Sequence, residues 1–412
     1  MQFIFTGQIF FYFCNLDAQI SDMDGTFIYN KAVSGRNFVG RKGDISALCN
    51  LLAQGENVVI SEPPRSGKTS LITQAFLNLS SSGTKSFIAL TVDLTDIRHI
   101  HDFALRLGSC LLSACYSTPT DYSRACTEFL SGTHLVFDEA SFRKNGKVLS
   151  SNWELDSNDL KAVMLLPYRL SRSIGKKIYT VFEEFQNVMR TEDGDMLCRL
   201  LEEAISEDRQ ERKNLAGWIF TGSRINAMKA IFGKGRHFFR LCETLSLSKI
   251  ETRDIIDHVL RGFNATGKVI DKDLLLGVCR LMDNNICYIN HFCAICDSLT
   301  RGYMMEPVLN EALSILLSIH RPRFTAIMDD LTTYQISFLL AVLEGQSRFT
   351  GADVIEHYGF NSSANVKRLR EALEKKEIIS FTSDAGGAES VAKVIDPLFE
   401  YWAKTYYFGI EI

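Results

Sequence analysis

The sequence predicts an α/β core, followed by a helical segment and a small C-terminal domain of three helices and a β-hairpin. Between about residues 36 and 245, short apolar runs rich in β-branched and aromatic residues alternate with longer helix-like stretches. This alternation is typical of a parallel sheet covered by helices on both faces. From about residue 247 the apolar spacing is helical throughout, and it changes again after Pro322.

The composition is that of a globular protein with room for two or three domains. The chain has 412 residues, of which 46% are hydrophobic, and a formal net charge of −4. This balance provides no overall basic field that would attract nucleic acid or an anionic membrane, so any DNA contact has to be local. Eleven cysteines without paired spacing favour a reducing compartment over a disulfide framework. We therefore expect a cytoplasmic protein that does not associate with membranes.

The first 34 residues form an N-terminal extension with an unusual start. Residues 1–16 are apolar and aromatic, and no Lys or Arg precedes Lys31. The stretch is short for a membrane span and lacks the basic beginning of a secretory signal. We expect that translation begins at Met23 and that the preceding stretch is a start-site artefact.

Four short apolar runs predict the strands of the core. They are Val58–Ser61, Phe87–Val92, Ile178–Phe182 and Trp218–Gly222. In open α/β sheets ligands bind at the carboxyl ends of the strands. Polar clusters follow three of these runs, so the sequence predicts one ligand site at that edge of the sheet.

The first of these clusters predicts a phosphate-binding P-loop. Such a loop needs backbone N–H groups at a helix N-terminus, a lysine that reaches the β- and γ-phosphates, and a hydroxyl for Mg²⁺. Gly67, Lys68 and Thr69 meet these three demands, between an apolar strand and a helix-like pattern. An ordinary βα turn with a lysine at the helix start is the alternative. The residues that we expect to bind nucleotide here are Arg65, Ser66, Gly67, Lys68, Thr69 and Ser70.

One position departs from the regular P-loop pattern. Where a glycine is usual, five positions before Gly67, this chain has Glu62. At about 4 Å, in an effective dielectric near 20, a like-charge pair costs on the order of 4 kcal/mol. That cost vanishes if Glu62 points away from the phosphates or pairs with Arg65. We expect ATP binding, with slow or regulated hydrolysis.

A pair of carboxylates at a strand end supplies candidate metal-binding and catalytic groups. Glu183 and Glu184 follow the strand at residues 178–182. We predict that Glu183, with Thr69, binds Mg²⁺ and that Glu184 is the general base for the attacking water. Asp138-Glu139 is the rival pair. We prefer the later pair because only about forty residues separate it from the next polar strand end.

That next strand end supplies a candidate sensor of the γ-phosphate. Ser223 follows the strand at residues 218–222, and its hydroxyl suits a phosphate or water contact as well as a helix N-cap. Arg236 and Arg240 follow the next helix. We choose Arg240 as the arginine that stabilises phosphate charge, either in its own subunit or in a neighbour.

The sequence after residue 247 predicts a helical part followed by a small domain of three helices and a hairpin. Amphipathic helices are expected at 334–343, 352–358 and 363–375, with strands at 378–381 and 391–395 around a turn at 384–387. Three helices and a hairpin make a winged helix-turn-helix. Within the preceding helical part, Cys293 and Cys296 have half of a zinc-site spacing, but the helical pattern around them favours buried cysteines.

Taken together, several motifs resemble those of the AAA-type P-loop ATPases of the STAND clade, in the archaeal and Bacteroidetes-type group that ends in a winged helix. The resemblance covers residues 35–407. The motifs that carry it are Phe-Val-Gly-Arg-Lys at 38–42, Pro-Arg-Ser-Gly-Lys-Thr-Ser-Leu at 64–71, Glu-Glu-Phe-Gln at 183–186, Gly-Ser at 222–223 and Asp-Pro-Leu-Phe-Glu-Tyr-Trp at 396–402.

The resemblance implies an ATP-dependent, Mg²⁺-requiring molecular switch. It implies an AAA-type ATP-binding core at 35–246, a helical lid at 247–325 and a winged helix at 326–412, with Val39, Gly40 and Arg41 near the adenine. The family usually has Asp-Glu where this chain has two glutamates. Its lid motif Gly-x-Pro-Tyr is replaced by residues 285–288, which puts a contact from the lid in doubt.

A different class of function remains open, in which a DNA-binding regulator or a scaffold carries a vestigial nucleotide site. Lys367, Arg368 and Arg370 on the third C-terminal helix suit phosphate and base contacts. Against this, residues 326–412 contain eight Lys or Arg and thirteen Asp or Glu, a net charge of −5. We therefore expect ATP and an unidentified protein as partners, with nucleotide-dependent self-association as a further possibility, and do not favour DNA.

Overall fold

The structure is a computed structural model that describes residues 10–13, 25–83, 86–210, 213–382 and 391–411. The predicted start at Met23 and the predicted turn at 384–387 lie outside these residues. The chain divides into two compact units. The first contains Lys42–Glu62 and Lys68–Leu247 with one preceding strand, and the second contains residues 25–41, Pro63–Gly67 and 248–411.

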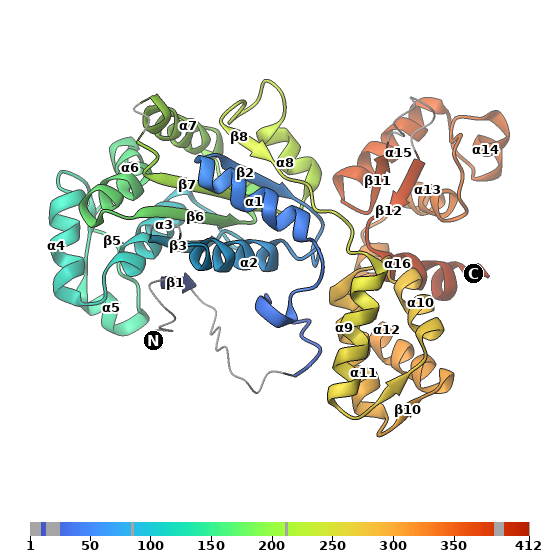
Figure 1. Ribbon diagram of the computed structural model, residues 1–412. Coiled ribbons are helices and arrows are strands. Elements are labelled where there is room, and N and C mark those ends of the chain that lie inside the picture. Colours follow the sequence, from blue (N-terminus) through green and yellow to red (C-terminus); the bar gives the residue numbers. More distant parts are fainter. Residues whose placement is uncertain (1–9, 14–24, 84–85, 211–212, 383–390, 412) are drawn as a thin grey trace. The chain divides into compact units, whose positions relative to one another are not determined.

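The first unit is built on a six-stranded parallel sheet (Figure 1) with the strand order β1-β3-β6-β7-β2-β8. The strand before the P-loop, β2 (Asn57–Ser61), lies between β7 (Ala216–Gly222) and β8 (Cys242–Thr244). On the other side of β7 the sheet continues through β6 (Lys177–Glu183), β3 (Phe87–Asp93) and β1 (Phe10–Phe13). The four predicted strands are confirmed within two residues, while β1 and β8 were not predicted.

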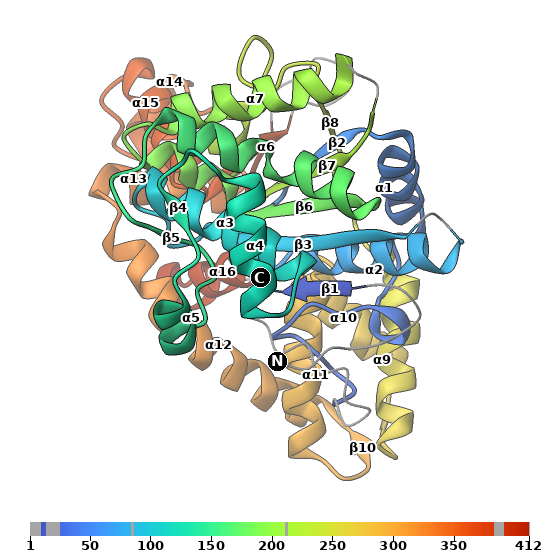
Figure 2. The ribbon, with the colours of Figure 1, turned by 90° about the vertical axis from the view of Figure 1, so that its left-hand side faces the viewer.

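Helices cover both faces of this sheet (Figure 2), as the alternation of apolar runs predicted. On one face Tyr179 of β6 contacts Phe76 of α2 (Lys68–Ser81), and on the other face Phe182 contacts Phe103 of α3 (Ile100–Cys115). Because side chains of a strand alternate between the two faces, residues 179 and 182 belong to opposite layers. Trp218 stacks on Phe182 and donates a hydrogen bond from its indole Nε1 to the Tyr168 hydroxyl at 2.8 Å.

The remaining elements of the first unit fill the connections between strands. They are α1 (Lys42–Gln54), α4 (Pro119–Phe129), β4 (Leu135–Val136), α5 (Glu139–Asn145), β5 (Ser150–Ser151), α6 (Ser157–Ile174), the 3₁₀ helix η2 (Phe185–Arg190), α7 (Gly194–Gln210) and α8 (Ile225–Phe232). The short strands β4 and β5 pair with each other in a separate two-stranded sheet. The insertion between β3 and β6 therefore adds no strand to the central sheet.

The part of the second unit where the sequence predicted a lid consists mainly of helices. It contains η1 (Gly35–Asn37), α9 (Thr252–Ala265), β9 (Val269–Ile270), α10 (Lys272–Leu281), α11 (Ile286–Leu299), β10 (Tyr303–Met304) and α12 (Glu306–Asp329). Helix α12 continues through Pro322, so the expected boundary at 325 falls inside a helix. Proline removes one backbone donor, and here the side chain at 322 is exposed, so its ring has room at the helix surface.

The last part of the second unit has the element order of a winged helix. It comprises α13 (Thr333–Leu343), α14 (Ala352–His357), α15 (Ser363–Lys375), β11 (Ile379–Thr382), β12 (Val391–Val394), α16 (Pro397–Trp402) and the π-helix η3 (Ala403–Phe408). Strands β11 and β12 pair antiparallel, as predicted. The three helices begin within one residue of the predicted positions. In the described part of the chain, no helix is long and apolar enough to cross a membrane.

Candidate functional site

The loop between β2 and α2 has the strand–loop–helix geometry that the sequence predicted. Strand β2 ends at Ser61 and α2 begins at Lys68, so the backbone N–H groups of the first turn of α2 lack helical partners. The Lys68 side chain is buried, with 9% of its surface exposed, and its Nζ donates to the Glu62 carbonyl oxygen at 2.7 Å. Burial lowers the pKa of Lys68, while the nearby carboxylates of Glu184, Glu62 and Glu183 act to raise it.

Contacts within the second unit hold the middle of the same loop. Nη1 of Arg41 donates to the Ser66 carbonyl oxygen at 2.5 Å, and Nε donates to the Ser248 carbonyl oxygen at 2.8 Å. Gly67 has φ +91°, a conformation that L side chains rarely adopt, and a Cβ there would lie 3.1 Å from Nη1 of Arg41. Among the described residues, the buried hydroxyl of Ser66 has no hydrogen-bond partner. Such an orphaned donor suits a phosphate or water oxygen.

The unusual Glu62 has a specific backbone partner. Its Oε1 accepts a hydrogen bond from the Leu247 backbone N–H at 2.9 Å. The carboxylate is therefore held by the chain segment that follows β8. It nevertheless remains close enough to Lys68 to influence the pKa of that group.

The first glutamate of the predicted pair meets the predicted metal-binding hydroxyl. The Thr69 hydroxyl donates to Oε1 of Glu183 at 2.6 Å. Burial is the main cause that raises the pKa of Glu183, and the carboxylates of Asp93 and Glu184 raise it further against the opposing effects of Thr69 and Lys68. Excess negative charge in a partly buried oxygen cluster is an environment that a hard divalent cation neutralises.

The second glutamate is held by the predicted sensor. Glu184 has left-handed backbone dihedrals, φ +55° and ψ +43°, which cost a residue with a Cβ about 1–2 kcal/mol. The Ser223 hydroxyl donates to Oε2 of Glu184 at 2.5 Å. The structure therefore joins the ends of β6 and β7 through the two side chains that the sequence assigned as base and sensor.

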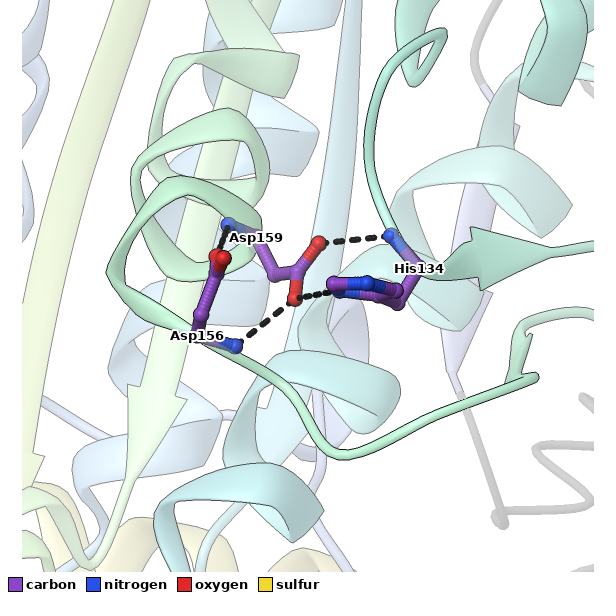
Figure 3. A group of neighbouring side chains, drawn as sticks. All are labelled: His134, Asp156 and Asp159. Carbon is purple, nitrogen blue, oxygen red and sulfur yellow. Dashed lines mark hydrogen bonds and ion pairs between the residues drawn. The ribbon is translucent and has the colours of Figure 1, made fainter.

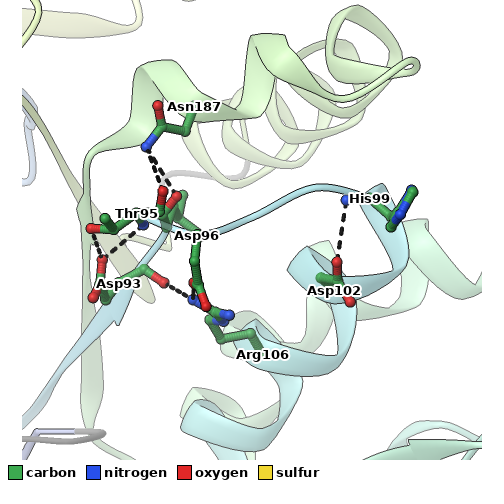
Figure 4. A network of polar contacts seen from close by, with 8 residues as sticks. Asp93, Thr95, Asp96, His99, Asp102, Arg106 and Asn187 are labelled. Atoms are coloured by element: carbon green, nitrogen blue, oxygen red, sulfur yellow. Dashed lines mark hydrogen bonds and ion pairs between the residues drawn. The ribbon is translucent and has the colours of Figure 1, made fainter.

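A polar network at the end of the neighbouring strand β3 was not predicted from the sequence (Figure 4). Asp93 is the register partner of Glu183, and its Oδ1 accepts from the Thr95 backbone and hydroxyl at 2.9 and 2.6 Å. Asn187 Nδ2 donates to the carbonyl oxygens of Leu94 and Thr95, each at 3.2 Å. The network ties the turn after β6 to the turn after β3. Asp93 follows a predicted strand, so a search for acids at strand ends could have found it.

The rival pair Asp138-Glu139 lies away from the sheet edge that carries the site. Asp138 is the N-cap of α5, with Oδ1 accepting from the Ala140 N–H at 3.0 Å, and the preceding β4 pairs with β5 in a separate two-stranded sheet. The strand that would have to place this pair at the sheet edge is therefore outside the central sheet. The preference for the later pair agrees with this geometry.

A group of potential metal ligands in the first unit is explained by local structure (Figure 3). His134, Asp156 and Asp159 have ligand atoms within 4.8 Å of one another. The buried Asp159 carboxylate accepts from the backbone N–H groups of His134 and Asp156, each at 2.7 Å, and Asp156 caps α6. Burial raises the pKa of Asp159, but these hydrogen bonds outweigh it and hold that pKa below its usual value. The group is a helix cap in which both oxygens of the Asp159 carboxylate already accept hydrogen bonds.

Within the first unit, Arg240 lies at the edge of the sheet where the strands begin, whereas Glu183 lies at the edge where they end. It precedes β8, whose first residue Cys242 is the register partner of Asn57, the first residue of β2. The Arg240 carbonyl oxygen accepts from Arg209 Nη1 at 2.7 Å. This placement gives no support to a contact of Arg240 with the site of its own subunit. A role toward a neighbouring subunit stays a prediction.

The residues expected near the adenine lie in the second unit. Val39 is buried, Gly40 has φ +65°, and a Cβ at position 40 would lie 2.9 Å from Cγ2 of Ile250. The close approach explains why glycine occupies this position. Their role toward an adenine stays a prediction, whereas the Arg41 contacts above show that this motif fixes the P-loop.

The segment 285–288, which replaces the usual lid motif, contacts the P-loop segment inside the second unit. The Arg65 guanidinium carbon lies 5.7 Å from the ring centre of Tyr288 on α11. The Tyr288 hydroxyl donates to Oδ2 of Asp396 at 2.8 Å, and Nη2 of Arg323 donates to the same oxygen at 2.7 Å. One cluster thus connects the loop, helices α11 and α12, and the residue that caps α16.

The cysteine pair on α11 lies inside the helical core of the second unit. Cys293 and Cys296 are both fully buried. Burial raises the pKa of Cys296 to about 12 and raises that of Cys293 well above its usual value. Because metals bind the thiolate, protonated thiols in an apolar helix interface are poor zinc ligands.

The protein has the fold of AAA-type P-loop ATPases. Models of known protein families and a set of curated proteins give no match to the chain. Among solved structures it is similar to the Walker-type ATPase of Pyrococcus abyssi, with 14% identity over 91% of this chain and 99% of that chain, and a TM-score of 0.64. It is also similar to the ORC2 protein of Aeropyrum pernix in ADPNP–ADP complexes, with 13% identity over 88% of this chain and 93% of that chain, and a TM-score of 0.53.

Proposed function

We propose that the protein binds ATP with Mg²⁺, hydrolyses it slowly, and acts as a nucleotide-dependent molecular switch. The observation that carries the proposal is the 2.6 Å contact between the Thr69 hydroxyl and the Glu183 carboxylate at the start of α2. Beside a triphosphate, Mg²⁺ needs oxygen ligands from the protein. Here a hydroxyl follows the P-loop, and a carboxylate ends β6, which is two strands away from β2 in the sheet. The fold likeness to nucleotide-dependent ATPases supports the same conclusion.

The residues around this contact fit a triphosphate and Mg²⁺. The start of α2 directs backbone N–H groups toward a bound phosphate, as helix N-termini do, the buried Ser66 hydroxyl would donate to a phosphate oxygen, and Lys68 supplies a positive charge. Thr69 and Glu183 would hold the Mg²⁺ ion, with Asp93 beside Glu183. When bound, the ion would neutralise charge on the β- and γ-phosphates.

The proposed chemistry assigns the base to Glu184. Its carboxylate takes a proton from a water molecule, and the water oxygen forms a bond to the γ-phosphorus. The bond between that phosphorus and the bridging oxygen breaks, and ADP and inorganic phosphate are the products. Ser223, which donates to Glu184 at 2.5 Å, would donate to the γ-phosphate instead when nucleotide is bound.

Two contacts support slow turnover. The Ser223 hydroxyl has a single proton, which it donates to Glu184, so it must exchange partners before it donates to phosphate, and one of the three Lys68 donors is held by the Glu62 carbonyl oxygen. The Glu62 carboxylate adds negative charge close to Lys68. Each of these features favours the nucleotide-free arrangement over the bound one.

We also propose the finer assignment to the STAND clade, in which the C-terminal winged helix changes its placement with nucleotide state. The element order of residues 333–394 supports this assignment, as does the cluster that joins Arg65, Tyr288 and Asp396. Self-association in the ATP state would give Arg240 a role toward the neighbouring subunit.

The DNA-binding alternative receives less support from the side chains of α15. Arg370 lies 3.6 Å from the Phe381 ring centre and 3.4 Å from a Glu374 carboxylate oxygen, and Lys367 lies 4.0 Å from Glu371. Cations engaged with their own helix or hairpin are less available to DNA phosphates. The net charge of −5 over residues 326–412 also weakens the attraction to DNA. The DNA-binding alternative predicts binding at low salt that falls steeply as the salt concentration rises.

The test begins with nucleotide binding to the whole protein. With Mg²⁺, ATP should raise the thermal unfolding midpoint, and ATP should be converted slowly to ADP. Glu184→Gln should keep the shift in midpoint and reduce turnover by about 100-fold or more, within the range typical of a lost general base. The control is Glu243→Gln, an exposed glutamate on β8. Absence of any shift with ATP would refute the proposed function, and unchanged turnover in Glu184→Gln would remove that residue from its role.

A further inference from the structure

Gln186 lies beside the candidate base, and the proposed function has not yet given it a role. It is the second residue of η2, and only 4% of its surface is exposed. Its Nε2 donates a hydrogen bond to Oε2 of Glu184 at 2.6 Å. A hydrogen bond from an amide to a charged carboxylate is stronger than a hydrogen bond between two neutral groups.

The same carboxylate oxygen is shared with the sensor. Oε2 of Glu184 accepts from Gln186 at 2.6 Å and from Ser223 at 2.5 Å. Within the part of the chain that the structure describes, both donors reach Oε2 and none reaches Oε1. Two donors on one oxygen fix the rotation of the carboxylate, and they leave the other oxygen able to accept a proton.

The surroundings of Gln186 set the orientation of its amide. Rotation of the amide by 180° would place its oxygen against the Glu184 carboxylate, where two acceptors repel each other. A Cβ at Gly222 would clash with Oε1 of Gln186 in the observed orientation. Glycine at the end of β7 therefore makes the room that the amide occupies. Oε1 of Gln186 is buried, and no described residue donates to it.

We propose that Gln186 is a positioning residue for Glu184 in ATP hydrolysis. It holds Oε2 so that Oε1 faces the attacking water, and it keeps this hold when Ser223 turns from Glu184 to the γ-phosphate. The inference rests on the proposed function, because it assigns Glu184 as the base. It adds a residue that neither binds nucleotide nor contacts the reacting atoms.

The kinetic test compares two substitutions of glutamine by methionine, which has a similar length and no amide. Gln186→Met should lower kcat at least tenfold while the KM for ATP and the ATP-induced shift in unfolding midpoint change less than twofold. Gln210→Met, at the exposed end of α7, is the matched control and should change neither. If Gln186→Met proves unstable, Gln186→Asn, whose amide is too short to reach Glu184, replaces it with the same expectation. An unchanged kcat in a folded variant overturns the proposal.

A second readout does not depend on turnover. In protein labelled with ¹⁵N-glutamine, the NMR signal of the Gln186 side-chain amide is identified as the one that is absent in Gln186→Met. This signal should shift in both Glu184→Gln and Ser223→Ala. An unmoved signal in Glu184→Gln overturns the contact itself. If the wild-type protein binds ATP but has no turnover, the proposed hydrolysis and the positioning role fail together. Turnover in the wild type that Gln186→Met leaves unchanged removes only the positioning role.

Discussion

The Glu62 carboxylate accepts a hydrogen bond from the backbone N–H of Leu247 at 2.9 Å. Two residues earlier, the Leu245 N–H donates to the Val59 carbonyl oxygen at 2.9 Å, which is a normal step of the parallel ladder between β2 and the chain after β8. At Leu247 the acceptor is a side chain instead of the strand backbone. A residue that departs from the usual P-loop pattern therefore extends the sheet by one more hydrogen bond.

The contact with Leu247 gives Glu62 two separate effects, a negative charge near the triphosphate and a hydrogen bond within the fold. The sequence could not distinguish them. Glu62→Gln removes the charge and keeps an oxygen that accepts from Leu247. We expect ATP to bind about tenfold more tightly to this variant, or about 1.4 kcal/mol, because a negative charge near the triphosphate is lost. The measurement is the dissociation constant for ATP with Mg²⁺ by isothermal titration calorimetry.

Glu62→Ala is the matched comparison. It also removes the charge, but it leaves the Leu247 N–H without its acceptor. We expect the same gain in affinity together with a loss of about 1 kcal/mol in the free energy of unfolding, the typical net value of one hydrogen bond. Equal ATP affinity in the wild type and both variants would show that the Glu62 charge does not reach the phosphates.

The contact of Thr69 with Glu183 predicts a metal-specific defect. Thr69→Val keeps the shape of the side chain and removes the hydroxyl that donates to Glu183 at 2.6 Å. We expect the affinity for ATP in the presence of Mg²⁺ to fall about tenfold, while the affinity measured with EDTA is unchanged. The control is Thr73→Val, one turn later on α2, whose hydroxyl donates to the Thr69 carbonyl oxygen. Equal losses with and without Mg²⁺ would argue against a metal ligand at this position.

His237 predicts a pH dependence of stability in the first unit. Burial acts to lower its pKa, but contacts with Glu202 and Asp195, each at 3.0 Å, outweigh burial and raise it. The contribution of a group with a raised folded-state pKa is complete below its unfolded value of about 6.5 and is lost as pH rises through the folded value. We therefore expect His237→Gln to lower the unfolding midpoint more at about pH 6 than at about pH 9. The control is His101→Gln on α3, and an equal loss at both pH values would contradict the prediction.

The cluster around Asp396 predicts a graded loss of stability in the second unit. Asp396 caps α16 by accepting from Leu398 and Phe399, and its Oδ2 accepts from Arg323 and Tyr288. We expect Asp396→Ala to cost about 2–4 kcal/mol, because a cap is worth about 1 kcal/mol and hydrogen bonds to a charged group about 1.5–3 kcal/mol. Asp396→Asn keeps the cap and should cost less. Urea unfolding followed by tryptophan fluorescence, to which Trp402 on α16 contributes, measures both, and equal losses would assign the whole effect to the contacts of Oδ2 with Arg323 and Tyr288.

The sequence by itself determined the order of the elements and the positions of the chemical groups. Apolar runs of strand length predicted β2, β3, β6 and β7, because a strand buried on both faces has to be apolar throughout. The same patterns predicted the three C-terminal helices and the hairpin. Parallel strands bring their carboxyl ends to one edge, which is why the order of residues alone was enough to group Thr69, Glu183, Glu184 and Ser223.

Only the tertiary structure decided which of these groups contact one another. The Glu62 contact with Leu247 spans 185 residues and the Ser223 contact with Glu184 spans 39, and no local pattern fixes the rotamers that make them. Gln186 is near Glu184 in sequence, yet its hold on Oε2 depends on the space that Gly222 leaves on another strand. Periodicity records which face of an element is buried, whereas hydrogen-bond partners depend on strand order and close packing between segments far apart in the chain.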